Sequence, residues 1–304
     1  MRHTNMNNMS NMSAKTFSLA APAKVNLFLH VTGRRDDGYH LLQSIVVFAD
    51  AGDHLTFSRH DSLFIDIQGY FADDVGDLRS NLVYKAAQAL AQEYDYVPTG
   101  HITLQKNLPV ASGMGGGSSD AATTLRGLCR LWGLSEENAR LERLAAQLGA
   151  DVPACLYRRA VWMEGVGDKM MRMQDMPEMH LVLVTPPVQT PTPEVFARFA
   201  RRFSGRYSPP IKHTGRRKNL QEWIADLRFY RNDLTDAAIE VSPDIRTALA
   251  AIAATPNCHI ARLSGSGATC FGLYDSAGAA QAAVNKLRLE YPHWWIKATG
   301  LFKE

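Results

Sequence analysis

A run of glycine and serine between residues 113 and 119 carries the strongest chemical signal in this sequence. Four of the five residues at positions 113–117 are glycine, and Ser118 and Ser119 follow directly. Glycine lets backbone amides converge on one centre and lets a ligand approach the main chain closely. The following residues, 121–132, have a helical pattern, and a helix amino terminus adds partial positive charge. Together these features predict a cradle for phosphate groups.

Two familiar nucleotide-binding loops fit this run poorly. A Walker loop needs GxxxxGK[ST], and positions 113–119 contain no lysine. A dinucleotide fingerprint needs GxGxxG; Gly113 and Gly115 match it, but Ser118 stands at the third glycine position. A flexible turn is the remaining alternative, although a turn needs one or two glycines rather than four. A phosphate cradle of this kind must obtain its cation from a metal ion or from a distant lysine.

The stretch PVASGMGGGSSDAA, residues 109–122, resembles the phosphate-binding loop of the GHMP kinase superfamily, with Met114 where leucine is usual. Two further segments resemble superfamily motifs in the same order, APAKVNLFL at residues 21–29 and LSGSGATCFGLY at residues 263–274. The resemblance implies a kinase that uses ATP with Mg²⁺ and holds ATP and acceptor in a cleft between two domains. It assigns ATP binding to Pro109, Val110, Ala111, Ser112, Gly113, Met114, Gly115, Gly116, Gly117, Ser118 and Ser119.

Lys24 and Asp151 are the candidate catalytic residues. From residue type alone, Lys24 would be a solvated strand lysine, and Asp151, which precedes Val152 and Pro153, would be a helix N-cap. The family pattern instead implies that both residues lie in the active site. Phosphoryl transfer depends mainly on positioning and charge stabilisation. Asp151 would therefore accept the proton of the acceptor alcohol, while Lys24 would hold the hydroxyl and the carboxylate in place.

Five further segments narrow the resemblance to the branch that phosphorylates the 2-hydroxyl of a cytidylyl alcohol in the non-mevalonate route to isoprenoid precursors. These segments are PAKVNLFL, TGRRDDGYHLLQS, GADVPACL, TPPVQTPTPEVF and RNDL. For that branch the resemblance implies acceptor binding by Asn26, Tyr39, His40, Pro193 and Phe196. Tyr39 and Phe196 would stack on the base, and His40 would recognise its edge. The alternatives are a GHMP kinase for mevalonate, homoserine or a sugar, and a catalytically inactive relative that binds RNA.

The sequence does not assign the metal ligands. Ser119 could reach a magnesium ion bound to ATP, and Glu164 is a second candidate, whose alternative is an exposed acid in a turn. Gly265 and Gly267 are expected to form a turn against the phosphate region, or else an ordinary hairpin turn. The metal site is therefore left open.

The sequence pattern predicts an α/β (α+β) fold of two domains, which positions these residues. The amino-terminal domain is expected to contain a mixed sheet with helices. Alternation over residues 23–31 predicts a strand with Lys24 and Asn26 on its polar side, followed by a turn at Asp37 and Gly38. Further strands are predicted at 41–48, 55–57, 63–67 and 101–105. Helices are predicted from a Ser80 cap to residue 94 and over residues 136–148, the second ended by Gly149.

The second half predicts β-α-β-β-α-β, the ferredoxin-like split βαβ pattern. Its strands are expected at 180–185, 259–265, 268–274 and 293–302, and its helices near 193–202, 220–227 and 277–290. A further helix is expected to open at Ser242 and Pro243. We place the boundary near Met176, which gives domains at 1–176, including a polar tail at 1–14, and at 177–304.

Composition predicts an ordinary globular protein: the 304 residues are 46% hydrophobic and 21% charged, with a formal net charge of +3. That charge does not indicate a nucleic-acid partner, and no apolar run approaches the roughly 20 residues of a membrane helix. The four cysteines form no CxxC pair, which favours free thiols in a reducing cytoplasm. Residues 198–218 hold eight Lys or Arg and no acid, which favours a solvated excursion. We expect a cytoplasmic enzyme for ATP and a small-molecule cytidylyl acceptor, without nucleic acid or membrane as partner and with its oligomeric state open.

Overall fold

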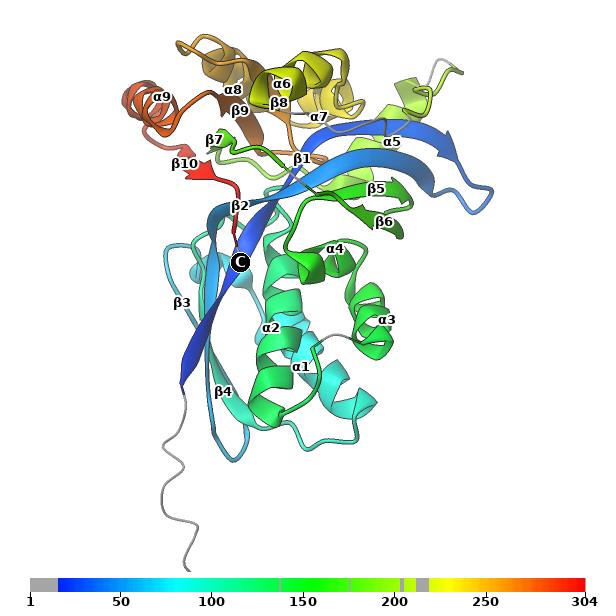
Figure 1. Cartoon of the computed structure of the whole chain (residues 1–304), viewed down its shortest axis with the longest axis vertical. Coiled ribbons are helices and arrows are strands. Elements are labelled where there is room, and N and C mark those ends of the chain that lie inside the picture. Colours follow the sequence, from blue (N-terminus) through cyan, green and yellow to red (C-terminus); the bar gives the residue numbers. More distant parts are fainter. Residues whose placement is uncertain (1–15, 137, 175, 203–204, 212–218, 304) are drawn as a thin grey trace, which may run out of the picture.

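The computed structural model describes residues 16–136, 138–174, 176–202, 205–211 and 219–303. The tail predicted at 1–14 and part of the basic segment at 198–218 lie outside these residues. Two long antiparallel strands, β1 (Phe17–Arg34) and β2 (His40–Ser58), run through the molecule (Figure 1). The strands predicted at 41–48 and 55–57 are therefore one strand. The prediction divided them because Asp50, Gly52 and Asp53 interrupt the apolar pattern.

The first sheet is mixed, as predicted. One edge of β2 pairs with β1, and the other edge pairs with β4 (Gly100–Gln105) through residues 54–58 and with β5 (Val161–Gly165) through residues 42–46. β3 (Leu63–Gln68) runs parallel to β4, and β6 (Lys169–Arg172) runs antiparallel to β5. Strands β5 and β6 were not predicted, because two strands of five and four residues around glycines resemble a loop.

Four helices lie together on one face of this sheet, namely α1 (Leu82–Glu93), α2 (Gly116–Trp132), α3 (Ala139–Leu148) and α4 (Val152–Tyr157) (Figure 1). The predicted cap of α1 is wrong: Asn81, not Ser80, accepts a hydrogen bond of 2.7 Å from the Val83 amide. The Ser80 hydroxyl instead donates to the Asp77 carbonyl in a short 3₁₀ turn, Leu78–Ser80. A second such turn, Asp73–Val75, precedes it.

The boundaries of α3 and α4 also differ from expectation. Helix α3 begins after Asn138, whose side chain accepts from the Leu141 amide, so its start lies three residues later than predicted, and Gly149 ends it as predicted. Helix α4 was not predicted, because six residues carry too little periodicity to stand out from a loop.

The second sheet has the order β10-β7-β9-β8 with antiparallel neighbours, which is the ferredoxin-like arrangement and confirms that prediction. Its strands are β7 (His180–Thr185), β8 (Ile260–Leu263), β9 (Cys270–Tyr274) and β10 (Trp295–Gly300). Its helices are α5 (Thr192–Arg202), α6 (Leu220–Phe229), α7 (Thr235–Val241), α8 (Asp244–Ala253) and α9 (Ala277–Glu290). Between β7 and β8 the described residues thus form four helices, and α7 was not predicted.

Both faces of β1 are buried, because the strand packs within the first sheet and against the second sheet at the same time. Val25 and Leu27 belong to a core cluster that also contains Leu183 and Phe271 from the second sheet. A register shift between Asn26 and Phe28 further breaks the simple alternation expected for this strand. The domain boundary near residue 176 stays a prediction.

Candidate active site

Helix α2 begins inside the glycine run, so the run is both a loop and the first turn of a helix. Gly115 is the N-cap residue, with a φ of 61° that favours glycine, and among the described residues no side chain caps the helix start. The first amides of a helix have no acceptor within the helix. The amides of Gly116, Gly117 and Ser118 therefore form an uncapped, partly positive end that suits an anion.

A second glycine motif holds this loop from the opposite side. The Ser112 carbonyl accepts hydrogen bonds from the Thr269 amide at 2.9 Å and from the Thr269 hydroxyl at 2.6 Å. Gly113 has a φ of 79°, and a Cβ at this position would lie 2.3 Å from the Gly267 carbonyl oxygen. Only glycine fits at 113, and the turn at Gly265 and Gly267 packs against the loop as the sequence analysis expected.

The residues predicted to bind ATP do not all face the same way. Nine of them line a cavity of about 390 Å³ beside the loop, the loop cavity: Pro109, Val110, Ala111, Ser112, Gly113, Gly115, Gly116, Gly117 and Ser118. Met114 is fully buried in the core, and its carbonyl accepts from the Lys24 amide at 2.8 Å. The Ser119 hydroxyl is buried and donates to the Pro22 carbonyl at 2.8 Å. Ser119 therefore does not line the loop cavity, whereas its neighbour Ser118 does, and contact between Ser119 and magnesium stays a prediction.

Lys24 and Asp151 meet, although 127 positions separate them in the chain. The Lys24 ammonium donates to Asp151 Oδ1 at 2.5 Å, and the side chains are 7% and 40% exposed. Asp151 occupies the N-cap position of α4, but its carboxylate accepts no capping hydrogen bond from that helix. The geometry thus excludes the alternative that Asp151 is a capping aspartate, and its carboxylate stays partly open to solvent.

Asn26 presents an unused acceptor next to this pair. The Ser44 hydroxyl donates to the Phe28 carbonyl at 2.5 Å, so it must accept from Asn26 Nδ2 at 2.8 Å. This chain of hydrogen bonds fixes the orientation of the Asn26 amide. Asn26 Oδ1 is buried without a partner among the described residues, and Asn26 lines the adjoining cavity. A buried acceptor of this kind suits a ligand that donates a hydrogen bond.

That second cavity has a volume of about 720 Å³ and contains Tyr39, His40 and Phe196 in its wall; we call it the tyrosine cavity. Both cavities are lined by Asp151, Ser118 and Thr192, together with Gly113 and Gly115. The two spaces therefore meet at the amino terminus of α2, beside the catalytic candidates. Two ligands placed in them would bring reacting groups together at this junction.

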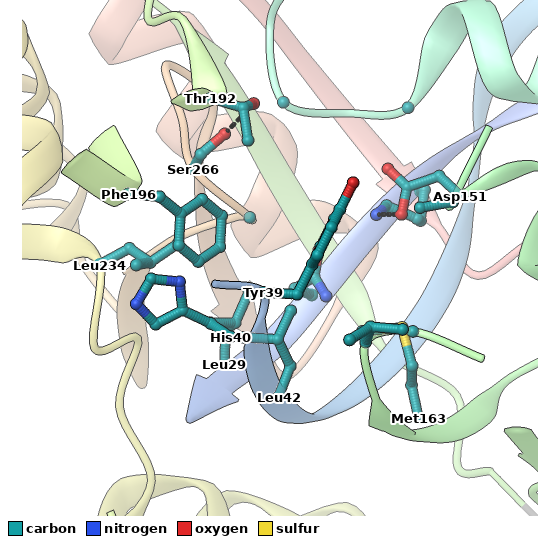
Figure 2. Close-up of a pocket in the computed structure, with 18 of the residues that line it drawn as sticks. Leu29, Tyr39, His40, Leu42, Asp151, Met163, Thr192, Phe196, Leu234 and Ser266 are labelled. Atoms are coloured by element: carbon teal, nitrogen blue, oxygen red, sulfur yellow. Dashed lines mark hydrogen bonds and ion pairs between the residues drawn. The ribbon is translucent and has the colours of Figure 1, made fainter. Parts of the chain in front are cut away.

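The aromatic residues of the tyrosine cavity are arranged differently from the simple pair expected. Tyr39 is 66% exposed and, in the view of Figure 2, stands between Phe196 and Asp151. Phe196 stacks on His40, with ring centroids 5.1 Å apart and planes inclined by 28° (Figure 2). Burial, and next the positive charge of Arg34, lowers the pKa of His40. The wall opposite Tyr39 is therefore a pair of rings, with His40 uncharged at neutral pH.

Pro193 does not line either cavity; it is an exposed residue in the first turn of α5. Its neighbour Thr192 takes that place and shares a hydrogen bond of 2.7 Å with Ser266 across the cavity wall (Figure 2). Arg34 also lines the tyrosine cavity. None of these three was predicted as a site residue, although Arg34, Thr192 and Ser266 all lie inside the segments quoted above.

Glu164 is a structural acid rather than a metal ligand. Its Oε1 accepts from Trp162 Nε1 at 2.8 Å and from Gln43 Nε2 at 3.0 Å, and these hydrogen bonds lower the pKa of Glu164. Within the part of the chain that the structure describes, no three His, Cys, Asp or Glu residues group as a metal site. In the same residues, no helix has the length and apolar character needed to cross a membrane.

Comparison with known proteins agrees with this geometry. Residues 81–159 match the GHMP kinase amino-terminal domain, and residues 212–293 match the GHMP kinase carboxy-terminal domain. The chain therefore belongs to the GHMP kinases, as its motifs predicted.

Its similar relatives define a narrower family. The 4-diphosphocytidyl-2-C-methyl-D-erythritol kinase of Paramagnetospirillum magneticum is 47% identical over 287 residues, which cover 94% of this chain and 99% of that protein. The kinase of the same name from Gluconacetobacter diazotrophicus is 45% identical over 296 residues, covering 94% and 95%. At these identities the chain belongs, among the GHMP kinases, to the family of 4-diphosphocytidyl-2-C-methyl-D-erythritol kinases.

Solved structures agree. A crystal structure of 4-(cytidine 5'-diphospho)-2C-methyl-D-erythritol kinase is 30% identical, with a TM-score of 0.77, and the match covers 95% of this chain and all of that one. A homoserine kinase from Cytophaga hutchinsonii shares the fold at 16% identity and a TM-score of 0.67, with 97% of each chain covered. The two-domain α/β prediction is thus confirmed.

Proposed function

We propose that this chain transfers the γ-phosphate of ATP to the 2-hydroxyl of 4-diphosphocytidyl-2-C-methyl-D-erythritol, a step of isoprenoid precursor synthesis. One observation carries the proposal beyond family membership: Lys24 and Asp151, paired at 2.5 Å, lie where the loop cavity and the tyrosine cavity meet. ATP in the first cavity and the acceptor in the second would place the γ-phosphate and the hydroxyl at Asp151.

The loop cavity suits the phosphates of ATP. The open amides of Gly116, Gly117 and Ser118 and the dipole of α2 would stabilise negative charge on the transferring group. Because phosphoryl transfer passes through a loose transition state, holding the phosphates in line with the acceptor supplies much of the rate enhancement.

Asp151 and Lys24 act on the acceptor. Asp151 accepts the hydroxyl proton as the new P–O bond forms, and the Lys24 ammonium holds the carboxylate and stabilises charge on the attacking oxygen. The ion pair stabilises the charged carboxylate, which makes proton transfer late rather than early. Asn26 Oδ1, the buried acceptor without a partner, receives a hydrogen bond from a hydroxyl of the acceptor and orients it.

The tyrosine cavity suits the cytosine end of the acceptor. A base between Tyr39 and the Phe196–His40 pair would gain roughly 1–3 kcal/mol from each stacking contact. Stacking tolerates any base, so the choice of cytosine requires hydrogen bonds to the base edge. His40 supplies these, with its uncharged imidazole and its backbone groups.

Magnesium is part of this proposal as a companion of ATP. The described residues form no dedicated cage for it, and Mg²⁺ commonly keeps its waters and binds through substrate phosphates. Bound there, the ion would supply positive charge that offsets the negative charge of the phosphates. A cytoplasmic location also belongs to the proposal, supported by four free cysteines, of which Cys129, Cys155 and Cys270 are buried.

A coupled assay of ADP release tests the function directly. We expect turnover with 4-diphosphocytidyl-2-C-methyl-D-erythritol and none above background with mevalonate or homoserine at the same concentration. CMP should inhibit more strongly than UMP if His40 forms the proposed hydrogen bonds to the cytosine edge. Equal inhibition by the two nucleotides, or faster turnover of mevalonate, would contradict the assignment of the tyrosine cavity.

A further inference from the structure

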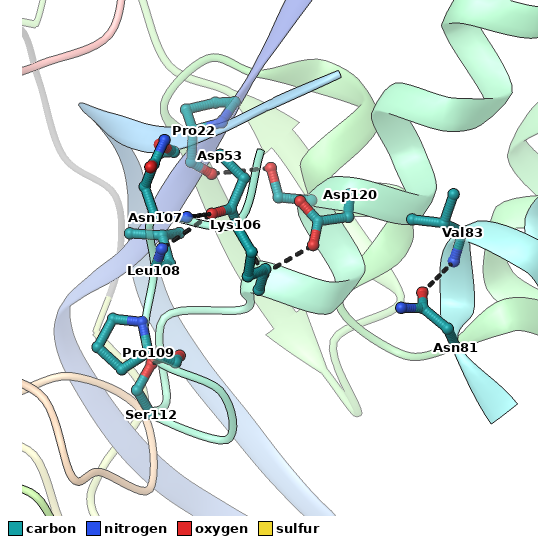
Figure 3. A network of polar contacts seen from close by, with 12 residues as sticks. Pro22, Asp53, Asn81, Val83, Lys106, Asn107, Leu108, Pro109, Ser112 and Asp120 are labelled. Carbon is teal, nitrogen blue, oxygen red and sulfur yellow. Dashed lines mark hydrogen bonds and ion pairs between the residues drawn. The ribbon is translucent and has the colours of Figure 1, made fainter. Parts of the chain in front are cut away.

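A buried cluster of Lys106, Asp53 and Asp120 lies beside the glycine loop and has no role in the chemistry above (Figure 3). The Lys106 ammonium donates to Asp53 Oδ2 at 2.5 Å and to Asp120 Oδ2 at 2.8 Å. All three side chains are at most 5% exposed. The sequence analysis did not predict the cluster, since its members come from β2, from the end of β4 and from α2.

Both carboxylate oxygens of Asp53 accept hydrogen bonds from the segment that enters the loop. Its Oδ1 accepts from the amides of Asn107 at 2.6 Å and Leu108 at 2.8 Å, and its Oδ2 accepts from Lys106 (Figure 3). These bonds fix the chain where it leaves β4 and turns toward Pro109. Asp53 thus ties β2 to the start of the phosphate loop.

Asp120 has a different environment from Asp53. Its Oδ2 accepts from Lys106, but its Oδ1 is buried without a partner among the described residues. Burial is the largest influence on the Asp120 carboxyl, Lys106 opposes it and Asp53 adds to it, and together they raise the pKa of Asp120 to about 8. With Asp120 protonated, one ammonium and one carboxylate remain, so the buried cluster is neutral.

The cluster touches the phosphate loop directly. Lys106 and Asp120 both line the loop cavity, together with the glycines at the start of α2. A Cβ at Gly116 would lie 3.2 Å from Lys106 Nζ and 3.7 Å from Asp53 Oδ2. The first turn of α2 therefore rests on the cluster, and any shift of Lys106 or Asp120 would move the amides that face the phosphates.

We propose that Lys106 is a positioning residue for nucleotide binding. Through Asp53 it is tied to the segment that enters the glycine loop, and through Asp120 it is tied to the first two turns of α2. These two ties orient the α2 amides toward the ATP phosphates. Lys106 is near the loop without being its missing phosphate-binding cation, because its ammonium already donates to the Asp53 carboxylate and to Oδ2 of the Asp120 carboxyl group. Its effect on ATP passes through the backbone. The inference rests on the proposed placement of ATP in the loop cavity.

Two substitutions at Asp120 separate the tie from its charge. Asp120→Asn keeps an oxygen acceptor for Lys106 without a negative charge. Asp120→Leu has a branched side chain like that of aspartate but a larger volume; it keeps the Lys106–Asp53 pair and removes the hydrogen bond that ties Lys106 to α2. Asp61→Asn, on the exposed turn after β2, is the control for replacing an aspartate by asparagine away from both cavities. For each protein we would measure the Kd of a non-hydrolysable ATP analogue by calorimetric titration, both KM values, kcat and Tm.

We expect Asp120→Asn and Asp61→Asn to bind the analogue within about threefold of the parent chain. Asp120→Leu should weaken binding at least about tenfold, as expected for losing a hydrogen bond to a charged group. The KM for ATP should rise with it, while the KM for the cytidylyl acceptor stays within about twofold, because Tyr39, His40 and Phe196 lie outside the cluster.

Three results would overturn the inference. The first is a folded Asp120→Leu chain that binds the analogue like the parent. The second is an equal rise of both KM values, which would indicate general damage to the fold. The third, which remains decisive if Asp120→Leu does not fold, is loss of nucleotide binding in a folded Asp120→Asn chain. Failure of the parent chain itself to bind the analogue would instead contradict the proposed function.

Discussion

Replacing Asp151 by asparagine tests the proposed chemistry at the residue shared by both cavities. Asparagine has nearly the same shape and can still accept a hydrogen bond from Lys24 through its amide oxygen, but it is a far weaker base. Loss of a general base usually lowers the rate by about 10²–10⁴-fold, which corresponds to roughly 3–5 kcal/mol in the activation free energy. We therefore expect kcat for ADP release to fall by that factor.

The structure predicts that stability and substrate binding change much less than kcat. The Asp151 side chain is 40% exposed, so its pair with Lys24 is partly screened by water. Lys24 is only 7% exposed, but asparagine still accepts a hydrogen bond from its ammonium, so the loss of stability should stay near 1 kcal/mol and lower Tm by about 2–4 °C. The acceptor's base is held at Tyr39 and Phe196, so the KM for the acceptor should stay within about threefold.

The assay is single-turnover phosphoryl transfer followed by quench, with Asp61→Asn as the control for the same change of charge on an exposed carboxylate. Single-turnover conditions separate chemistry from product release. A folded Asp151→Asn chain with the kcat of the parent would refute the assignment of the base. A large rise of the acceptor KM with unchanged kcat would instead make Asp151 a binding residue.

Two further predictions concern the cavity wall and the core. Burial and then Arg34 lower the pKa of His40, so CMP binding should stay constant from pH 8 to below pH 6.5 and weaken only at lower pH, where the imidazole gains its proton. Arg34→Gln removes one lowering influence, so in a titration of CMP affinity against pH the loss of binding should begin at a higher pH. An unshifted curve would contradict the stated cause. Gly127→Ala should destabilise the fold by about 1–3 kcal/mol in urea unfolding, because the added Cβ would lie 2.1 Å from the Phe57 ring. The control Gly278→Ala, whose Cβ would have nothing within 4 Å, should be neutral or stabilising. Equal stability of the two variants would show that α2 can move away from Phe57.

The parts of the fold that the sequence predicted are those with a long local pattern. The β7 to β10 order follows from strong strand patterns and an extended helical segment, and α9 has a clear cap at Ser276. The β5–β6 hairpin and α4 were missed because each is too short to show a period. The cap of α1 was displaced by one residue, since serine and asparagine stand side by side at positions 80 and 81 and both are good caps.

Long-range pairing explains what the sequence could not predict about the site. Nothing local distinguishes Lys106 from a surface lysine; its burial depends on Asp53 and Asp120, from two other elements. Ser118 and Ser119 are adjacent and chemically alike, and the pitch of α2 decides that only Ser118 faces the cavities. The stacking of Phe196 on His40 likewise depends on how α5 packs against the turn after β1.

The shared core around β1 limits how this molecule can move. Val25 and Leu27 pack with Leu183 and Phe271 of the second sheet. A hinge motion that moved the two sheets apart as rigid bodies would therefore expose these apolar side chains to water. Entry of a substrate as large as a cytidylyl alcohol must then depend on local motions at the cavity rim. The turn at Gly38 and the β5–β6 turn at Gly167 both border the tyrosine cavity and both have a positive φ. We expect hydrogen exchange to be fast and ligand-sensitive in these two turns, while β1 exchanges only through global unfolding.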